Sequence, residues 1–346
     1  MIALKGKAKE VGYIFGEIAK QSIRETVISL NLPDGWEGRA ERFRKIVEES
    51  APHWLEEGEA IAKASGVDFS VLLAYNLPSL KEDCTSFIAL SSRDGFPILH
   101  KNRDFAIQRQ SFYIKRIEGF LKYIAGASPS DLGVAYFLNE AGLAGACNTG
   151  GYCDIPPSEG LLDRHILRLI AERARNRGEA LKIVEEHLNK GFLSTEGENR
   201  GFILLLLDGE GGMIIEYTPN ELKWEEAREG LMIRSNLFLL LNDKKEDISS
   251  QQRLKRAQEL LGGKGKLGLE DIWETARDRS GSYPICSHHT VSAFTALLHP
   301  QLPSLSIAFC FPGPPDKAIP FPLSIVADET PEELLRGDFW VNPREE

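Results

Sequence analysis

The stretch CTSFIALSSRDGFPILHKNRDF, residues 84–105, decides the fold of this chain. Two short apolar runs, TSFIALS and FPILHKN, flank Arg93-Asp94-Gly95. The Asp-Gly pair suits the positive φ angles of a tight turn between two strands. The stretch therefore predicts a β-hairpin, which returns residues 101–105 alongside the strand that begins at Cys84.

The character of the sequence changes at this hairpin. Upstream of it, apolar residues recur at three- and four-residue spacing between Phe43 and Ala62, a pattern that predicts helices. We expect Pro52 to start one helix, Gly66 to end it and Asp68 to cap the next. Downstream, the pattern predicts strands at 113–118, 133–139, 202–208, 213–217, 231–236, 290–298 and 304–311, and helices around 161–170 and 180–188.

Helices come in pairs in this order, and strands come in consecutive runs joined by Gly and Asp turns. Alternating βαβ units would instead place a helix after each strand. We therefore predict an α+β fold of antiparallel sheets covered by helices.

Composition excludes several classes of protein. The net charge of -10 and the pI near 5.4 argue against a nucleic-acid partner, which needs clustered Lys and Arg. The longest apolar runs have the length of strands, so no membrane span is expected. Lys, Glu and Gly interrupt the apolar residues at the N-terminus, so we expect no secretory signal and a cytoplasmic protein.

The five cysteines, at 84, 147, 153, 286 and 310, form no C-x-x-C pair. An odd number leaves at least one free thiol and argues against a disulfide framework. Cys147, Cys153 and Cys310 are expected to be small buried apolar residues. The run Cys286-Ser287-His288-His289 lacks a second ligand pair at zinc spacing, so we expect a loop-to-strand junction there, with no metal and no cofactor.

The dipeptide Asp83-Cys84 suggests that the protein cuts itself at this peptide bond. Cys84 would then carry a free α-amine with a pKa of roughly 8, close enough to its own thiol to act as the base. Asp104, returned by the hairpin, is a carboxylate placed to orient that amine. Taken alone, Cys84 is a buried thiol by default, and Asn102-Arg103-Asp104 is a solvated strand end.

These residues resemble the N-terminal-nucleophile hydrolases of the penicillin acyltransferase and choloylglycine hydrolase group. In that group the β-subunit opens with Cys-Thr, and an Asn-x-Asp motif preceded by Arg or Gln follows. The matching residues here are Cys84-Thr85 and Lys101-Asn102-Arg103-Asp104. Lys101 departs from the Arg of bile-salt hydrolases, so the bidentate recognition that Arg allows is not carried over directly. Further matches are Asn139-Glu140-Ala141-Gly142-Leu143, Asn148, Asn236 within IRSNLF, Ser249-Ser250-Gln251-Gln252-Arg253 and the final run PSLSIAFCFPGPP.

The resemblance implies a four-layer αββα sandwich of two antiparallel sheets. It also implies a helical leader, residues 1–83, that packs on an 84–346 β-subunit, the two forming one structural domain. Cys84 would be the nucleophile, with Asp104 and Arg253 beside it. The backbone N–H of Asn148 and the side chain of Asn236 would form the oxyanion hole. Each residue also has a plain structural alternative: a strand end for Asn236, a turn for Asn148 and an exposed helix face for Arg253.

The function implied is that of an autoprocessing hydrolase that cleaves a linear amide of a small N-acyl amine, amino acid or peptide. One alternative is an acyltransferase that moves an acyl group from a thioester donor to an amine. The other is a non-catalytic binding protein on the same fold. We expect Lys101, Phe105, Tyr152 and Phe238 to contribute to the substrate pocket. The expected partners are the small substrate and the two subunits cut from one chain, and a homo-oligomer stays open.

Overall fold

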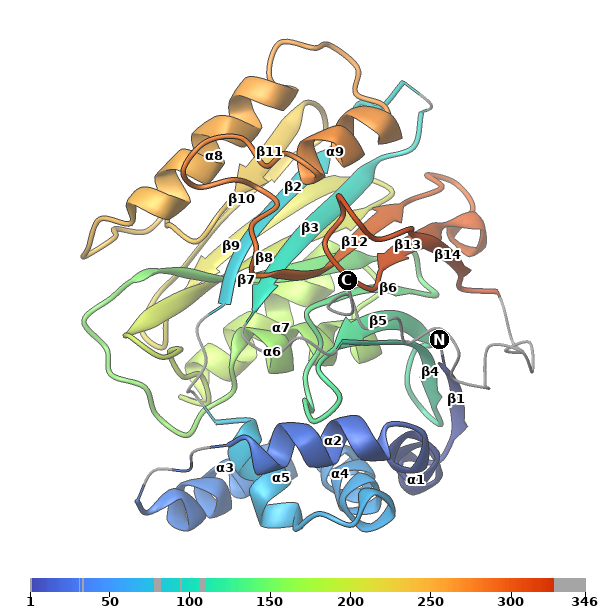
Figure 1. Ribbon diagram of the computed structural model, residues 1–346, viewed down its shortest axis with the longest axis vertical. Coiled ribbons are helices and arrows are strands. Elements are labelled where there is room, and N and C mark those ends of the chain that lie inside the picture. The colour runs from blue at the N-terminus through green and yellow to red at the C-terminus, as the bar shows by residue number, and fades with distance from the viewer. Residues whose placement is uncertain are drawn as a thin grey trace.

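Two β-sheets packed face to face form the centre of the molecule (Figure 1). The computed structural model describes residues 2–30, 32, 34–77, 82–93, 95–105 and 110–326. In spatial order, the larger sheet contains β1 (Ile2–Gly6), β4 (Ser111–Ile117), β5 (Tyr123–Ala127), β6 (Tyr136–Asn139), β7 (Ala144–Tyr152), β8 (Arg200–Asp208), β9 (Gly211–Tyr217) and β10 (Leu222–Ala227). The smaller sheet contains β11 (Leu231–Arg234), β2 (Glu82–Ala89), β3 (Ile98–Phe105), β12 (Thr290–Leu297), β13 (Ile307–Phe311) and β14 (Phe321–Ser324).

Helices cover both outer faces of this pair of sheets (Figure 1). On the smaller sheet lie α8 (Ile248–Leu261) and α9 (Leu269–Ala276). On the larger sheet lie α6 (Asp163–Arg173) and α7 (Arg177–Asn189), and a bundle of five N-terminal helices packs on the same side. The bundle consists of α1 (Ala8–Ile18), α2 (Lys20–Ile28), α3 (Trp36–Ser50), α4 (Pro52–Ser65) and α5 (Phe69–Tyr75), and a short 3₁₀ turn, η1 (Pro303–Leu305), lies near the end of the chain. The predicted α+β fold with helix layers outside two sheets is confirmed.

Within the described strands, neighbouring strands are antiparallel except for β1 and β4, which pair in parallel. The β1–β4 pair is a departure from the expected all-helical leader, because the N-terminal segment begins with a strand of the larger sheet. Five residues, IALKG, are too few for a clear alternation of apolar and polar side chains. The strand β7 was also missed, since its sequence AGACNTGGY is rich in residues that are rare in strands.

Local signals fixed several boundaries as predicted. Pro52 is the first residue of α4, and Gly66 ends that helix with a left-handed φ of 71°. The carboxylate of Asp68 accepts the Ser70 N–H at 2.7 Å and caps α5. The hairpin between β2 and β3 is confirmed, with Gly95 at φ 77°, whereas Asp94 lies outside the described residues.

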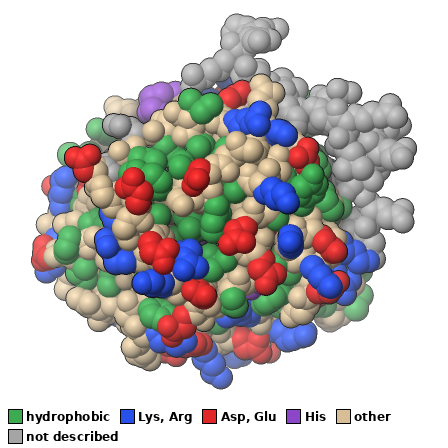
Figure 2. Space-filling model, turned by 90° about the horizontal axis from the view of Figure 1, so that it is seen from below, with side chains coloured by type: hydrophobic (Ala, Val, Ile, Leu, Met, Phe, Trp, Pro, Cys, Tyr) green, Lys and Arg blue, Asp and Glu red, His purple; other side chains and the backbone are tan. Residues whose placement is uncertain are grey.

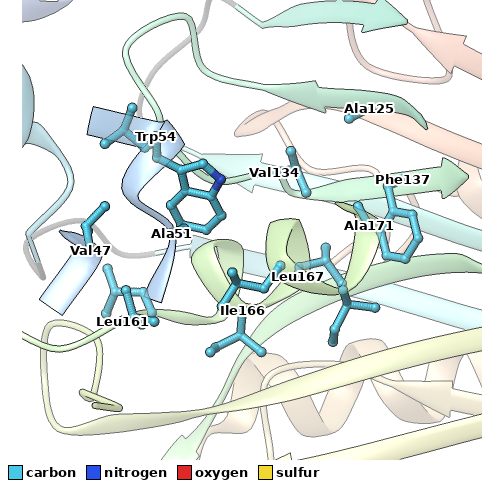
Figure 3. Packing of buried hydrophobic residues seen from close by; sticks show 14 of the residues in the cluster. Val47, Ala51, Trp54, Ala125, Val134, Phe137, Leu161, Ile166, Leu167 and Ala171 are labelled. Carbon is cyan, nitrogen blue, oxygen red and sulfur yellow. The ribbon is translucent and has the colours of Figure 1, made fainter. Parts of the chain in front are cut away.

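Three apolar clusters hold the layers together. One lies between the two sheets and another between the smaller sheet and α8 with α9. The largest joins the N-terminal bundle to α6 and the larger sheet, and Trp54 lies at this junction (Figure 3). Burying a large apolar side chain contributes about 1.5–3 kcal/mol. The bundle is therefore part of the main core.

A buried group of charges reinforces the same junction. Glu57 of α4 lies 2.5 Å from the ammonium of Lys115 in β4 and also contacts the guanidinium of Arg168 in α6. Arg168 in turn donates to Glu172 at 2.8 Å. Burial alone would raise the pKa of Glu57, but the Arg168 and Lys115 cations outweigh it and lower that pKa. Three separate segments of the chain are thus held by one charge network.

The outer face of the N-terminal bundle carries charges of both signs interspersed with hydrophobic side chains (Figure 2). Four apolar side chains of α1 and α2 are exposed, namely Tyr13, Ile14, Ile18 and Ile28. Among the residues that the structure describes, no helix combines the length and the apolar character that crossing a bilayer requires.

Replacing Glu57 tests the charge network. Glu57→Gln leaves Lys115 and Arg168 without their shared carboxylate, so we expect the free energy of unfolding to fall by about 3–5 kcal/mol. Chemical denaturation measures this change. The exposed neighbour Glu56 is the control, and Glu56→Gln should change stability by less than about 0.5 kcal/mol. Equal effects of the two variants would contradict the role of the network.

Candidate active site

Cys84 is fully buried near the start of β2, a central strand of the smaller sheet. In the register of β2 with β3, Cys84 faces Arg103 and Asp83 faces Asp104. Opposed residues share a face of the sheet, and successive residues alternate between faces. Cys84 and Arg103 thus lie on one face, and Asp83 and Asp104 on the other.

The Cys84 face of β2 is directed at the larger sheet. Ser86, two residues further along, donates its hydroxyl to Asn148 Oδ1 of β7 at 2.8 Å. The Asn148 amide also donates to the carbonyl of Ser235, at 3.1 Å, next to Asn236. The structure therefore brings Asn148 and Asn236 close together beside the Cys84 strand, and Asn148 lies within a strand rather than a turn.

Both peptide groups of Cys84 are held by side chains. Its N–H donates to Asn236 Oδ1 at 2.7 Å, and its carbonyl accepts from Arg253 Nη1 at 2.5 Å. Arg253 also donates to Thr85 Oγ1 at 3.1 Å and to Asn236 Oδ1 at 3.0 Å. The Asn236 amide donates to the Thr149 carbonyl at 2.7 Å. A strand, a helix and a loop therefore meet at the backbone of Cys84.

The start of α8 explains the orientation of Arg253. The carboxylate of Asp247 caps this helix by accepting the Ser250 N–H at 3.0 Å. Arg253 lies one turn further along, where Ser250 Oγ accepts from its Nη2 at 3.3 Å and Ser249 Oγ from its Nε at 3.4 Å. The exposed helix face considered for Arg253 is not observed, because the side chain is buried.

Asp104 is bound by two hydroxyl groups from the segment that leads into β12. Thr290 donates to its Oδ1 at 2.6 Å and Ser287 to its Oδ2 at 2.8 Å. Burial raises the pKa of Asp104 and the opposed Asp83 carboxylate adds to this rise, while Arg253 opposes it. The run Cys286-Ser287-His288-His289 was considered as a metal site from the sequence. The sequence did not predict that Ser287 donates a hydrogen bond to Asp104.

A cavity of about 520 Å³ opens beside the Asp83–Asp104 pair. Phe105, which we expected in the substrate pocket, lines this cavity. The lining consists of Asp83, Asp104, Phe105, Ser249, Arg253, Ser282, Tyr283, Pro284, Ser287, His288 and His289.

The other expected substrate residues lie elsewhere. Phe238 lines a second cavity, of about 370 Å³, together with Asp243. Tyr152 lies beside it, because its N–H donates to Asp243 Oδ1 at 2.6 Å. Lys101 is completely buried, and its ammonium donates to the carbonyls of Cys147 and Ala135 between the sheets. This position does not fit direct contact of Lys101 with substrate.

Arg103 is the residue at this site that the sequence analysis overlooked. It is buried opposite Cys84, and its Nη1 donates to Gln110 Oε1 at 2.6 Å. Its guanidinium lies 4.3 Å from the ring centroid of Phe105. The observed register of β2 and β3 places Arg103, rather than Asp104, across from Cys84.

None of the five cysteines, all of which lie in the described part of the chain, forms a disulfide. Cys147 and Cys310 are buried as expected, and Cys153 is partly exposed. Burial raises the pKa of the Cys286 thiol to about 12, and the nearby Asp316 carboxylate contributes to the rise. Within the described part of the chain, no group of three or more His, Cys, Asp or Glu side chains is placed to hold a metal ion.

The family model for acyl-coenzyme A:6-aminopenicillanic acid acyl-transferase matches residues 91–309. The chain belongs to this family. The matched range contains Asp104, Asn148, Asn236 and Arg253 and begins after Cys84. The resemblance seen in the sequence is thus confirmed at the level of the family.

Solved structures similar to this family member share little sequence with it. An N-acylethanolamine-hydrolyzing acid amidase ortholog from Caenorhabditis elegans is 15% identical, with 64% of this chain and 94% of that chain covered and a TM-score of 0.45. Penicillin V acylase from Agrobacterium tumefaciens is 14% identical, with 72% and 89% covered and a TM-score of 0.48. A mutant conjugated bile acid hydrolase from Clostridium perfringens is 13% identical, with 71% and 93% covered and a TM-score of 0.46. No curated protein matches the chain.

The substitution Arg253→Lys tests the hydrogen bond from Arg253 to the Cys84 carbonyl. Lysine keeps the charge but loses the planar fork that reaches the Cys84 carbonyl and Asn236 together. We expect unfolding to become easier by about 1.5–3 kcal/mol, the range for hydrogen bonds to charged groups. Arg256, on the same helix and 2.8 Å from Asp278, is the control. Arg256→Lys should cost less than about 1 kcal/mol in the same denaturation experiment, and a larger loss there than at Arg253 would refute the assignment.

The raised pKa of Asp104 predicts a pH dependence. A carboxyl with a folded pKa above its ordinary value of 3.8 binds more protons in the folded state. Its contribution to stability is therefore present below about pH 4 and is lost as the pH rises through the folded pKa. In the uncut Cys84→Ala chain, the protein with Asp104 should lose stability relative to Asp104→Asn as the pH rises through the folded pKa, measured by urea denaturation.

Asp278 serves as the control for that experiment. Burial would raise the pKa of this carboxyl, but hydrogen bonds from Arg256 and Ser280 outweigh it and lower the pKa. Its contribution should be present at neutral pH and lost as the pH falls through the lowered pKa. Asp278→Asn should thus give a slope of opposite sign, and equal slopes for the two variants would contradict the burial argument.

Proposed function

We propose that this protein is an autoprocessing cysteine hydrolase that cleaves the linear C–N bond of a small N-acyl amine, amino acid or peptide. The observation that carries the proposal is that both backbone groups of Cys84 are hydrogen-bonded to side chains, the N–H to Asn236 and the carbonyl to Arg253. Such preorganisation of a nucleophile and its attached nitrogen is what acyl transfer requires. Membership of an acyltransferase family supports it.

The first reaction is on the chain itself. The Cys84 thiol adds to the Asp83 carbonyl carbon, the C–N bond breaks, and the Cys84 nitrogen takes the proton. Water then hydrolyses the thioester and releases residues 1–83 from residues 84–346. Asn236 Oδ1 already accepts from the nitrogen that leaves.

In the second reaction the new amine of Cys84 takes the proton from its own thiol, which attacks a substrate amide. An ordinary α-amino pKa of roughly 8 suits this base. Asp104 stabilises the ammonium that forms. The backbone N–H of Asn148 and the Asn236 amide are proposed donors to the oxyanion, and loss of one such donor costs about 3–4 kcal/mol in the barrier.

The two products are proposed to stay together as one structural domain. The parallel β1–β4 pair and the Glu57–Lys115–Arg168 network both cross from residues 1–83 to residues 84–346. The apolar cluster around Trp54 crosses in the same way (Figure 3). The cleaved protein is therefore expected to behave as an α/β heterodimer.

An acyltransferase is the second candidate, because the matching family model describes one. Both reactions pass through the same Cys84 acyl-enzyme. They differ only in whether water or an amine attacks it.

Intact mass measurement tests self-cleavage. The purified protein should give two chains divided after Asp83, whereas Cys84→Ala should give one chain, because the nucleophile is lost. The control is Cys153→Ser, at a partly exposed cysteine away from the β2 strand, which should cleave like the wild type. A wild-type chain that stays uncut would support the non-catalytic binding protein instead.

Adding an amine separates the two catalytic candidates. The cleaved enzyme is incubated with an N-acyl amide and a second amine at millimolar concentration, and the products are resolved by mass. A hydrolase should yield mainly the free acid. Predominant transfer of the acyl group to the added amine would instead establish the acyltransferase.

Asp104→Ala should lower turnover by about 10²–10⁴-fold, the typical range for a proton-transfer group, in a protein that stays folded.

A further inference from the structure

We propose that the acyl site of the cleaved enzyme selects acyl groups that end in a carboxylate, of the succinyl type, and that Arg253 is the partner of that carboxylate. The inference rests on the function proposed above. It names the part of the substrate that the geometry around Asp83 favours.

The chemical basis is that self-cleavage and turnover pass through the same species. In self-cleavage the acyl group moves from nitrogen to Cys84 Sγ, and the intermediate is a Cys84 thioester with a free amine. In turnover the substrate amide gives a Cys84 thioester with a free amine as well. The acyl group is Asp83 in the first case and the substrate acid in the second. Asp83 therefore marks the space that a substrate acyl group enters.

The Asp83 side chain lies against a cation in that space. Its Oδ1 is 3.6 Å from Arg253 Nη2, and both residues line the cavity of about 520 Å³. Two carbon atoms, Cα and Cβ, separate the Asp83 carbonyl carbon from its carboxylate. A succinyl group has the same spacing between its amide carbonyl and its carboxylate.

Arg253 is fixed in this position independently of Asp83. Its Nη1 donates to the Cys84 carbonyl and to Thr85 Oγ1, its Nη2 to Asn236 and Ser250, and its Nε to Ser249. All of these partners belong to residues 84–346, so they stay when residue 83 leaves. The same edge of the guanidinium then faces the cavity without the Asp83 carboxylate.

Loss of the Asp83 carboxylate and gain of the Cys84 ammonium also make the cavity more positively charged. Asp104 remains, and its two oxygens accept from Thr290 and Ser287. Against it stand Arg253 and the new ammonium of Cys84. An acyl group with a carboxylate restores the lost negative charge beside Arg253, whereas an apolar acyl group would take the Arg253 cation further out of water without a compensating charge.

Three amides that differ only at the end of the acyl chain test this inference. The cleaved enzyme is assayed with N-succinyl-, N-succinamoyl- and N-butyryl-4-nitroaniline, which carry a carboxylate, a neutral amide of equal size and a methyl group. We expect kcat/KM for the succinyl compound to exceed both others by about tenfold or more, as a charge-assisted hydrogen bond allows. Equal values, or a preference for the neutral compounds, would overturn the inference.

A binding measurement gives an answer that does not depend on turnover. Succinate and butyrate are compared for their ability to protect Cys84 of the cleaved enzyme from alkylation by iodoacetamide, with labelling read by mass. Succinate should protect at about tenfold lower concentration, and equal protection would count against the inference. Failure of the chain to cleave, in contrast, would overturn the proposed function itself, so the two failures are distinguishable.

Discussion

The hydrogen bond from the Arg253 guanidinium to the Cys84 carbonyl is the constraint on which the site depends. Arg253 is buried, and taking a cation out of water costs several kcal/mol unless hydrogen bonds replace the lost hydration. Its partners belong to β2, to the start of α8 and to the loop that carries Asn236. Satisfying the cation thus requires these three segments to take one relative position. Because a planar fork allows little variation in geometry, this requirement also fixes the peptide bond before Cys84.

The start of β2 is a place where two chemically different faces of one sheet meet. Cys84 and Arg103 lie on the face of the smaller sheet that is directed at the larger sheet. Asp83 and Asp104 lie on the opposite face, which carries α8 and the cavity. A nucleophile in the middle of a strand would be confined to one face. Cys84 is the third residue of β2 and is fully buried, whereas its neighbour Asp83 lines the cavity. Cleavage at this position would therefore connect a buried thiol to an open pocket.

The sequence predicted those features that depend on local pattern. The hairpin follows from its apolar runs and turn, and the order of motifs located Cys84, Asn236 and Arg253, which the structure brings into hydrogen-bonding distance. What it did not predict depends on pairing between distant segments, as for β1 on β4 and for Glu57 with Lys115. Such pairs leave no periodic signal in either segment.

Lys101 shows that residues of one sequence motif can lie on opposite faces of a strand. The motif puts Lys101 and Asp104 three residues apart, and on a strand an odd separation places two side chains on opposite faces. Asp104 reaches the cavity, so Lys101 must face the interior, where the carbonyls of Cys147 and Ala135 accept from its ammonium. The register of the hairpin thus decides which motif residues a substrate can reach.

The charges around Asp104 give the intact and the cleaved chain different properties. In the intact chain, two carboxylates share the neighbourhood of Arg253, and burial together with Asp83 raises the pKa of Asp104. If the bond before Cys84 is cut, one carboxylate leaves and an ammonium appears one residue along the strand. Both changes favour the ionised form of Asp104, because a like charge is replaced by an opposite one. Burial is the largest cause of the raised pKa of Asp104 and Asp83 is a smaller one, so cleavage would remove only the smaller contribution.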